Sequence, residues 1–260
     1  MKELHILGIC ATKNRVSHLK KVIRCFLEQD YTGPSTLFIY NNETSKIIKY
    51  KNTKEEQKLG EFELPPNKKI IVINHSTKLG TNRDYNNLGE IYNDILEFIP
   101  LADLVVHMDD DDTYLPDHFS KGLEGYHRGG LLAYKPEKSW FKTHDKLSLE
   151  KNVLEPSIFV NYDYLKSEGY FPRNVDLHHK WVQPLIDKKQ IYVDPKGKAT
   201  FIYDWSGTIP VWKTSGDPYN PNNFNNYIQN STDKGNGILL PISKEDLLKY
   251  EPQYNLLYRK

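Results

Sequence analysis

The chain has 260 residues, a length that suits one globular domain. It has 35 basic and 34 acidic side chains and a formal net charge of +1, so it lacks the charge by which strongly basic proteins favour nucleic acid. It has two cysteines, Cys10 and Cys25, too few for a disulfide framework, and no apolar stretch approaches the roughly 18 residues that a spanning helix needs. We therefore expect a cytoplasmic protein without a membrane span, in the host cytoplasm if the source is viral.

The first 112 residues alternate between strand and helix patterns. Strands are expected at 4–11, 36–40, 69–74 and 104–108, and helices from Ser17 and from Leu88. This order predicts an α/β fold with a Rossmann-like, open, mostly parallel sheet flanked by helices. Ligands of such sheets bind at the carboxyl ends of the strands, where Arg15, Asn41, Asn42 and a run of aspartates all fall.

Beyond Pro116 the alternation weakens. Strands are expected at 131–134, 157–160, 191–193 and 199–203, and helices at 162–169 and near Trp181. Residues 205–237 are dense in Gly, Pro and Asn, which predicts a loop or lid, and Ser243 then begins a short C-terminal helix.

Four consecutive aspartates, Asp109 to Asp112, follow the apolar run 104–108 directly. Four like charges repel one another, and a divalent cation would offset that repulsion. Strand alternation would place Asp109 and Asp111 on one side and Asp110 and Asp112 on the other. Carboxylate ligands suit Mg2+ or Mn2+ better than zinc. A solvated acidic loop is the alternative, and a calcium-binding loop is disfavoured because no glycine or further oxygen ligands follow.

Several motifs, taken in order, resemble those of GT-A glycosyltransferases of the large nucleotide-sugar-dependent family two. Thr12-Lys13-Asn14-Arg15 resembles the family's Thr-x-Asn-Arg opening, and the aspartate run with Leu115-Pro116-Asp117 resembles its DxD motif and the segment after it. Further matching segments are Phe26 to Tyr31, Asn41-Asn42, Leu79-Gly80, Asn87-Leu88-Gly89 and Gly169-Tyr170-Phe171.

The resemblance implies a single GT-A domain over 1–260, with a nucleotide-binding half at 1–117, an acceptor-side half at 118–204, and a flexible lid loop and C-terminal helix at 205–260. It implies transfer of a sugar from a nucleoside-diphosphate sugar, expected to be a UDP-sugar, to an acceptor hydroxyl with Mn2+ or Mg2+. The implied metal ligands are Asp109, Asp111 and Asp204. The implied nucleotide-sugar contacts are Thr12, Arg15, Asn41, Asn42, Asn87, Asp109 and Asp110.

The chain departs from the family where the catalytic base is expected. The usual Glu-Asp pair is missing after residues 169–171, where Asp176 is the nearest carboxylate and His178 or His179 lies closer to the expected position. An imidazole can also act as a base near neutral pH, so the catalytic candidates are Asp176, His178, His179 and Asp112. Inversion and retention of the anomeric configuration both stay open. Asp204 stands where family members often present a metal-binding histidine.

A glycan is the expected acceptor, and the sequence is also compared with three other functions. A phage-type enzyme that glycosylates hydroxymethylated DNA bases is one, because basic stretches such as Lys20-Lys21 could contact phosphates. A nucleotidyltransferase is disfavoured because Gly8 to Ala11 is poor in glycine. A catalytically inactive sugar- or nucleotide-binding module is favoured by the missing Glu-Asp pair and opposed by the aspartate cluster.

Overall fold

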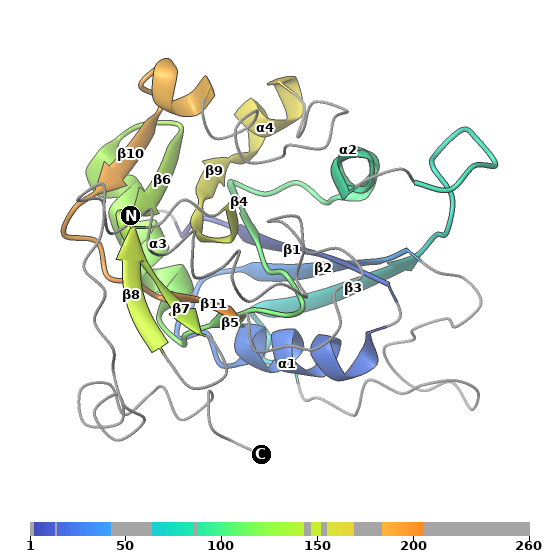
Figure 1. Ribbon diagram of the computed structural model, residues 1–260, viewed down its shortest axis with the longest axis horizontal. Coiled ribbons are helices and arrows are strands. Elements are labelled where there is room, and N and C mark those ends of the chain that lie inside the picture. Colours follow the sequence, from blue (N-terminus) through green and yellow to red (C-terminus); the bar gives the residue numbers. More distant parts are fainter. Residues whose placement is uncertain are drawn as a thin grey trace, which may run out of the picture.

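Seven strands form the central sheet of the computed structural model, which describes residues 3–13, 15–42, 64–85, 88–142, 147–151, 155–168 and 184–204 (Figure 1). The strand order is β10-β6-β9-β4-β1-β2-β3. These strands are β1 (Ile6–Thr12), β2 (Ser35–Asn41), β3 (Lys68–Asn74), β4 (Leu104–His107), β6 (Ala133–Pro136), β9 (Phe159–Asn161) and β10 (Ile191–Asp194).

The central sheet is mostly parallel, which confirms the predicted fold class. β3, β2, β1 and β4 pair in parallel, and so do β6 and β10. Between these two groups, β9 runs antiparallel to both β4 and β6. The carboxyl ends of β1, β2 and β4 therefore meet at one edge of the sheet, as an open α/β sheet requires for a ligand crevice.

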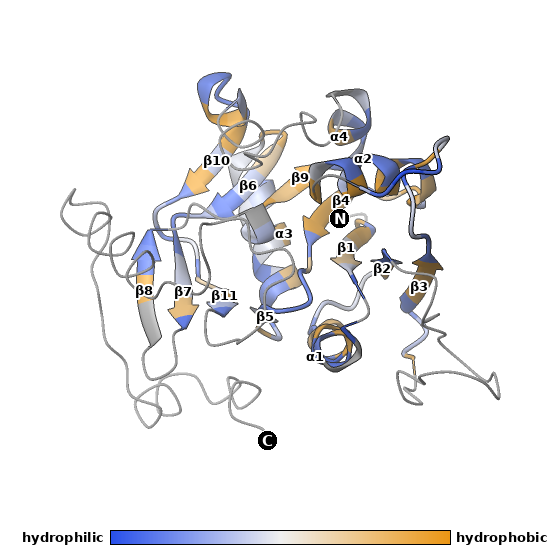
Figure 2. Cartoon of the chain, turned by 45° about the vertical axis from the view of Figure 1, so that its right-hand side comes forward, coloured by the Kyte–Doolittle hydropathy of each residue, from blue (hydrophilic) through white to orange (hydrophobic). Residues whose placement is uncertain are grey.

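Helices pack on both faces of this sheet, because its strands are apolar on both sides. In β1, Leu7 and Ile9 join the core cluster that includes α2 (Leu88–Phe98), while Ile6 and Cys10 join the one that includes α1 (Val16–Leu27). This division follows from the period-two alternation of side chains along a strand. Figure 2 shows the resulting hydrophobic colouring of β4 and β9 in the middle of the sheet.

A second sheet of four short strands lies beside the central one, and the sequence patterns did not predict it. Its order is β5-β11-β7-β8, with β5 (Thr113–Tyr114), β11 (Phe201–Asp204), β7 (Lys138–Lys142) and β8 (Leu147–Lys151). The predicted strands at 191–193 and 199–203 belong to different sheets, since β10 pairs with β6 while β11 pairs with β5 and β7. β5 begins directly after Asp112, so this sheet borders the aspartate run.

Helix α3 (His118–Gly129) was also missed, because three glycines make its sequence a poor helix former. The packing explains all three, since a Cβ on Gly129 would lie 2.5 Å from the Tyr192 side chain. A Cβ on Gly122 would lie 2.1 Å from the Phe159 ring, and one on Gly125 would lie 2.0 Å from the Tyr134 ring. The glycines therefore let α3 approach the sheet more closely than any other residue would allow.

The remaining elements are η1 (Glu155–Ser157) and α4 (Tyr162–Glu168). The position of α4 agrees with the helix predicted at 162–169. Both cysteines are free and buried, so no disulfide joins them. Within the described ranges, no helix combines the length and apolar character needed to cross a bilayer. The predicted helix near Trp181, the lid loop and the C-terminal helix fall largely or wholly outside the described residues.

His118, at the start of α3, makes the stability of the fold sensitive to acid. It is 1% exposed, its Nδ1 lies 2.9 Å from Thr200 Oγ1, and burial lowers its pKa to about 3. The unfolded chain binds a proton at this residue below the ordinary pKa of 6.5, whereas the folded chain does not. The stability that comes from the neutral ring is therefore complete above pH 6.5 and declines as the pH falls below that value.

We expect His118→Gln to lose less stability on acidification than the unsubstituted protein. Between pH 7 and pH 5, the free energy of unfolding of the unsubstituted protein should fall by about 2 kcal/mol more than that of the variant. Urea unfolding at both pH values measures this difference. Equal losses in the two proteins would show that His118 does not carry the effect.

Candidate active site

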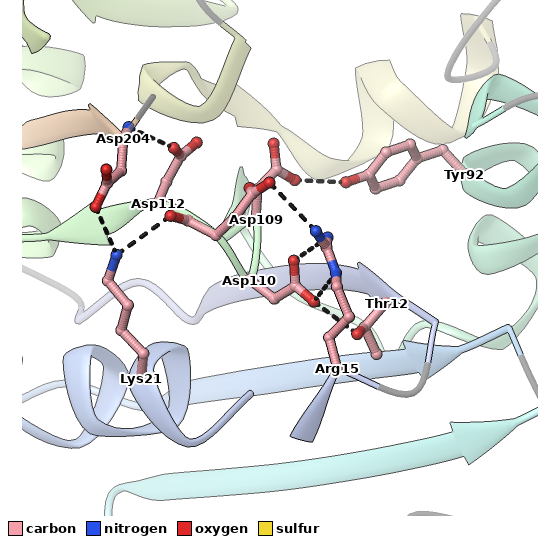
Figure 3. Close-up of polar contacts among 9 residues, drawn as sticks. Thr12, Arg15, Lys21, Tyr92, Asp109, Asp110, Asp112 and Asp204 are labelled. Carbon is pink, nitrogen blue, oxygen red and sulfur yellow. Dashed lines mark hydrogen bonds and ion pairs between the residues drawn. The ribbon is translucent and has the colours of Figure 1, made fainter. Parts of the chain in front are cut away.

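The aspartate run forms a turn between β4 and β5 (Figure 3). Its four side chains differ in exposure. Asp110 is 0% and Asp112 is 1% exposed, whereas Asp109 and Asp111 are of intermediate exposure. The exposure alternates as the period-two pattern predicted. Two carboxylates are therefore enclosed by protein and two lie nearer the surface.

Asp110 is held by two residues from the end of β1 and the loop after it. The Thr12 hydroxyl donates to Oδ2 at 2.6 Å, Arg15 Nε donates to the same oxygen at 2.9 Å, and Arg15 Nη2 donates to Oδ1. The pairing of Ile9 with His107 brings these segments together, because Thr12 and Asp110 each follow the paired residues by three positions. Burial raises the pKa of Asp110 to about 6, and the Arg15 guanidinium opposes that rise.

Arg15 also reaches the next aspartate. Its Nη1 lies 3.3 Å from Asp111 Oδ2, and the two side chains are 15% and 18% exposed. The guanidinium therefore joins the fully buried Asp110 to the more open Asp111. A planar guanidinium that binds one carboxylate through two nitrogens is fixed in orientation as well as in position.

Two buried tyrosines hold Asp109. The Tyr92 hydroxyl, from α2, donates to Asp109 Oδ1 at 2.8 Å, and the Asp109 backbone N–H donates to the Tyr114 hydroxyl at 2.5 Å. The Tyr92 ring also packs on the His107 ring, with centroids 4.6 Å apart. Both the backbone and the side chain of Asp109 are thus tied to neighbouring elements.

Asp112 links the turn to the second sheet. Its Oδ1 accepts a hydrogen bond of 3.0 Å from the backbone N–H of Asp204, at the end of β11. The Asp204 carboxylate contacts Lys142 Nζ at 3.2 Å and Lys21 Nζ at 3.4 Å, and Lys21 also donates to the carbonyl of Asp111 at 3.2 Å. Asp204 is therefore close to the aspartate turn, with the ammonium groups of Lys21 and Lys142 beside it. Figure 3 shows the contact with Lys21.

Asn41 and Asn42 lie at the end of β2, next to β1. Asn41 Nδ2 donates to Asn74 Oδ1 at 2.8 Å, and the Asn42 amide faces the carbonyl groups of His75 and Ser76. Asn41 is 0% and Asn42 is 6% exposed. They join the ends of β2 and β3 at the edge of the sheet that carries the aspartates, and their contact with a nucleotide base stays a prediction.

The carboxylates fit one kind of metal site and not another. Within the described residues, no group of three or more His, Cys, Asp or Glu side chains could hold a metal ion by itself. Mg2+ and similar ions, however, are commonly bound through one or two carboxylates together with water and substrate phosphates. Asp109 and Asp111, with their hard oxygen donors and partial exposure, fit that second arrangement.

Four of the predicted site residues, Asn87, Asp176, His178 and His179, lie outside the described residues. The structure brings together Thr12, Arg15, the four aspartates and Asp204, all of which were predicted from the sequence.

Four neighbours of these residues were not assigned to the site from the sequence: Lys21, Tyr92, Tyr114 and Lys142. Tyr92 falls among the apolar residues of the helix predicted from Leu88, and nothing in the sequence distinguishes its hydroxyl as part of the site. Lys21 was noted only as part of a basic stretch, and Lys142 reaches the site only because β7 pairs with β11, where Lys142 is the partner of Asp204.

Comparison with solved structures shows that this chain shares its fold with GT-A-like glycosyltransferases. Staphylococcus aureus TarS (residues 1–349) in complex with UDP-GlcNAc superposes with a TM-score of 0.53 at 12% identity, over 82% of this chain and 61% of that one. Mannosyltransferase PcManGT from Pyrobaculum calidifontis, in complex with GDP-Man and Mn2+, gives 0.51 at 12% identity, over 81% and 59%.

The chain thus spans about three-fifths of the length of these two structures. No protein-family profile matches the sequence, and no curated protein is significantly similar to it. At 12% identity the likeness concerns the fold.

Proposed function

We propose that the protein is a metal-dependent glycosyltransferase that moves a sugar from a nucleoside-diphosphate sugar to an acceptor hydroxyl. The observation that carries this proposal is the pair of half-buried carboxylates, Asp109 and Asp111, at the carboxyl end of β4 in a GT-A-like fold. A divalent cation bound there would neutralise the charge that develops on the diphosphate leaving group.

The described residues would have distinct roles in this reaction. Asp111 and Asp109 would hold the cation and the nucleotide. Arg15 would keep a fixed positive charge beside Asp111, because its guanidinium is bound by Asp110, which the Thr12 hydroxyl holds in turn. Asn41 and Asn42, at the end of the neighbouring strand, would bind the base through hydrogen bonds to its edge.

On the acceptor side, Asp112 would hold the end of β11 against the aspartate turn, through its hydrogen bond to Asp204. Asp204 would add an oxygen ligand to the metal. Alternatively, its ion pairs with Lys21 and Lys142 would orient these two ammonium groups toward the diphosphate. The base that removes the acceptor proton would come from Asp176, His178 or His179. We propose the same division into nucleotide-binding half, acceptor-side half and lid as the sequence motifs suggest.

A UDP-sugar is the proposed donor and a glycan the proposed acceptor. The UDP-GlcNAc bound to TarS supports a uridine nucleotide, and the GDP-Man and Mn2+ bound to the mannosyltransferase support a nucleotide-sugar with a divalent metal. We therefore include both nucleotides in the test.

A thermal-shift panel tests the proposal. UDP, GDP, dTDP and CDP are each added with Mn2+, Mg2+ or EDTA, because a ligand that binds the folded state raises the melting temperature. We expect UDP to raise it in the presence of Mn2+ or Mg2+ and much less in EDTA. A shift with another nucleotide would change the donor, whereas no metal-dependent shift with any of them would contradict the proposed function.

A further inference from the structure

Asp109, in the aspartate run, is hydrogen-bonded to Tyr92 of the preceding helix, α2. Tyr92 is 1% exposed and lies on α2, and its hydroxyl donates to Asp109 Oδ1 at 2.8 Å. From this geometry we propose that Tyr92 is a positioning residue, which sets the orientation of the Asp109 carboxylate for nucleotide and metal binding. The inference rests on the proposed function and names a residue on which its binding site depends.

The position of the Tyr92 hydroxyl is set by packing. Its neighbours on α2, Ile91 and Ile95, are 1% and 0% exposed and pack in the core cluster that also contains Leu7 and Val105 of the sheet. The Tyr92 ring packs on His107, the last residue of β4, with centroids 4.6 Å apart. A hydroxyl held by both a helix and a strand has little freedom to move away from the carboxylate.

Asp109 needs such support because it lies beyond the end of β4, in the turn. A carboxylate on a turn can adopt several rotamers, and a ligand that requires one of them then binds more weakly. The Tyr114 hydroxyl accepts the Asp109 N–H, which holds the backbone, and Tyr92 holds the side chain. Hydrogen-bonding partners that orient metal-ligating groups typically contribute roughly tenfold to a hundredfold to metal affinity.

The chain contains a matched control for the loss of this hydroxyl. Tyr85 is 7% exposed and donates to Asp94 Oδ2, also at 2.8 Å. Asp94 accepts in addition the backbone N–H of Leu79, so this second pair holds the loop before α2. Tyr85→Phe and Tyr92→Phe each keep the ring and remove one buried hydroxyl from a carboxylate, and Tyr85→Phe also removes a hydrogen bond of 2.7 Å with the Tyr40 hydroxyl. Only Tyr92→Phe changes the aspartate turn.

The experiment compares the unsubstituted protein, Tyr92→Phe and Tyr85→Phe by calorimetric titration with UDP and with GDP, in Mn2+ and in EDTA. We expect Tyr92→Phe to weaken nucleotide affinity in Mn2+ by roughly tenfold or more, and to change the electron paramagnetic resonance spectrum of Mn2+ in the complex. Tyr85→Phe should leave both unchanged. Urea unfolding of both variants shows whether they are equally well folded.

The outcomes separate this inference from the proposed function. A loss confined to Mn2+ supports positioning of a metal ligand, and an equal loss in EDTA supports positioning of a direct nucleotide contact. Unchanged affinity and Mn2+ spectrum in Tyr92→Phe, or equal losses in both variants, would overturn the positioning role while leaving the proposed function intact. Failure of the unsubstituted protein to bind either nucleotide would contradict the proposed function and this inference with it.

Discussion

Replacing Asp111 with asparagine is expected to remove metal-dependent nucleotide binding while leaving the protein folded. The Asp111 side chain is 18% exposed and contacts Arg15 Nη1 at 3.3 Å, so the substitution disturbs a partly solvated contact rather than the core. Asparagine has nearly the same shape, but its amide is uncharged and a much weaker ligand for a hard cation. Losing one of two carboxylate ligands should weaken UDP binding in Mn2+ by at least roughly a hundredfold.

Calorimetric titration of UDP in Mn2+ and in EDTA measures this effect, and Asp163→Asn is the matched control. Asp163 is an exposed aspartate in α4, just after β9. Because Asn161 pairs with Leu104 at the start of β4, α4 lies at the opposite end of that strand from Asp111. Binding in Mn2+ that survives Asp111→Asn at full strength would remove Asp111 from the metal site.

The second large effect is expected at Arg15. Arg15→Met keeps an unbranched side chain of similar reach but removes the guanidinium that binds both oxygens of Asp110. Asp110 is 0% exposed, so its carboxylate would stay buried. Among the described contacts, the Thr12 hydroxyl would remain as its hydrogen-bond donor. Removing one partner of a buried ion pair typically costs about 3 kcal/mol or more, and we expect a loss of that size in the free energy of unfolding.

The double variant Arg15→Met/Asp110→Asn distinguishes this cause from a general loss of packing. Replacing the carboxylate with a neutral amide removes the buried charge, so urea unfolding should show that most of the lost stability returns. Arg24→Met, at an exposed position of α1, should change stability by no more than about 0.5 kcal/mol. If the double variant is no more stable than Arg15→Met, the buried charge of Asp110 is not the source of the loss.

Much of the central sheet could be predicted from sequence because its strands carry strong local signals. β1, β2 and β4 are apolar runs with both faces buried, and each ends at the polar residues that mark the site. The alternating exposure of the aspartates matches the period of two that the sequence predicted for a continued strand, but the structure places all four in the turn between β4 and β5. The α3 helix escaped prediction because its glycines satisfy close contacts with Phe159 and Tyr134, which are distant in sequence.

The sequence by itself determined the mostly parallel α/β fold, the order of its first elements and the aspartates at the end of β4, since hydrophobic periodicity and turn residues act over a few positions. Only the tertiary structure decided which groups surround those aspartates. Asp110 meets Arg15 across 95 residues, and Asp112 meets Asp204 across 92. Tyr92 meets Asp109 because α2 packs beside the end of β4. Such contacts depend on how strands pair and helices dock, which no local pattern records.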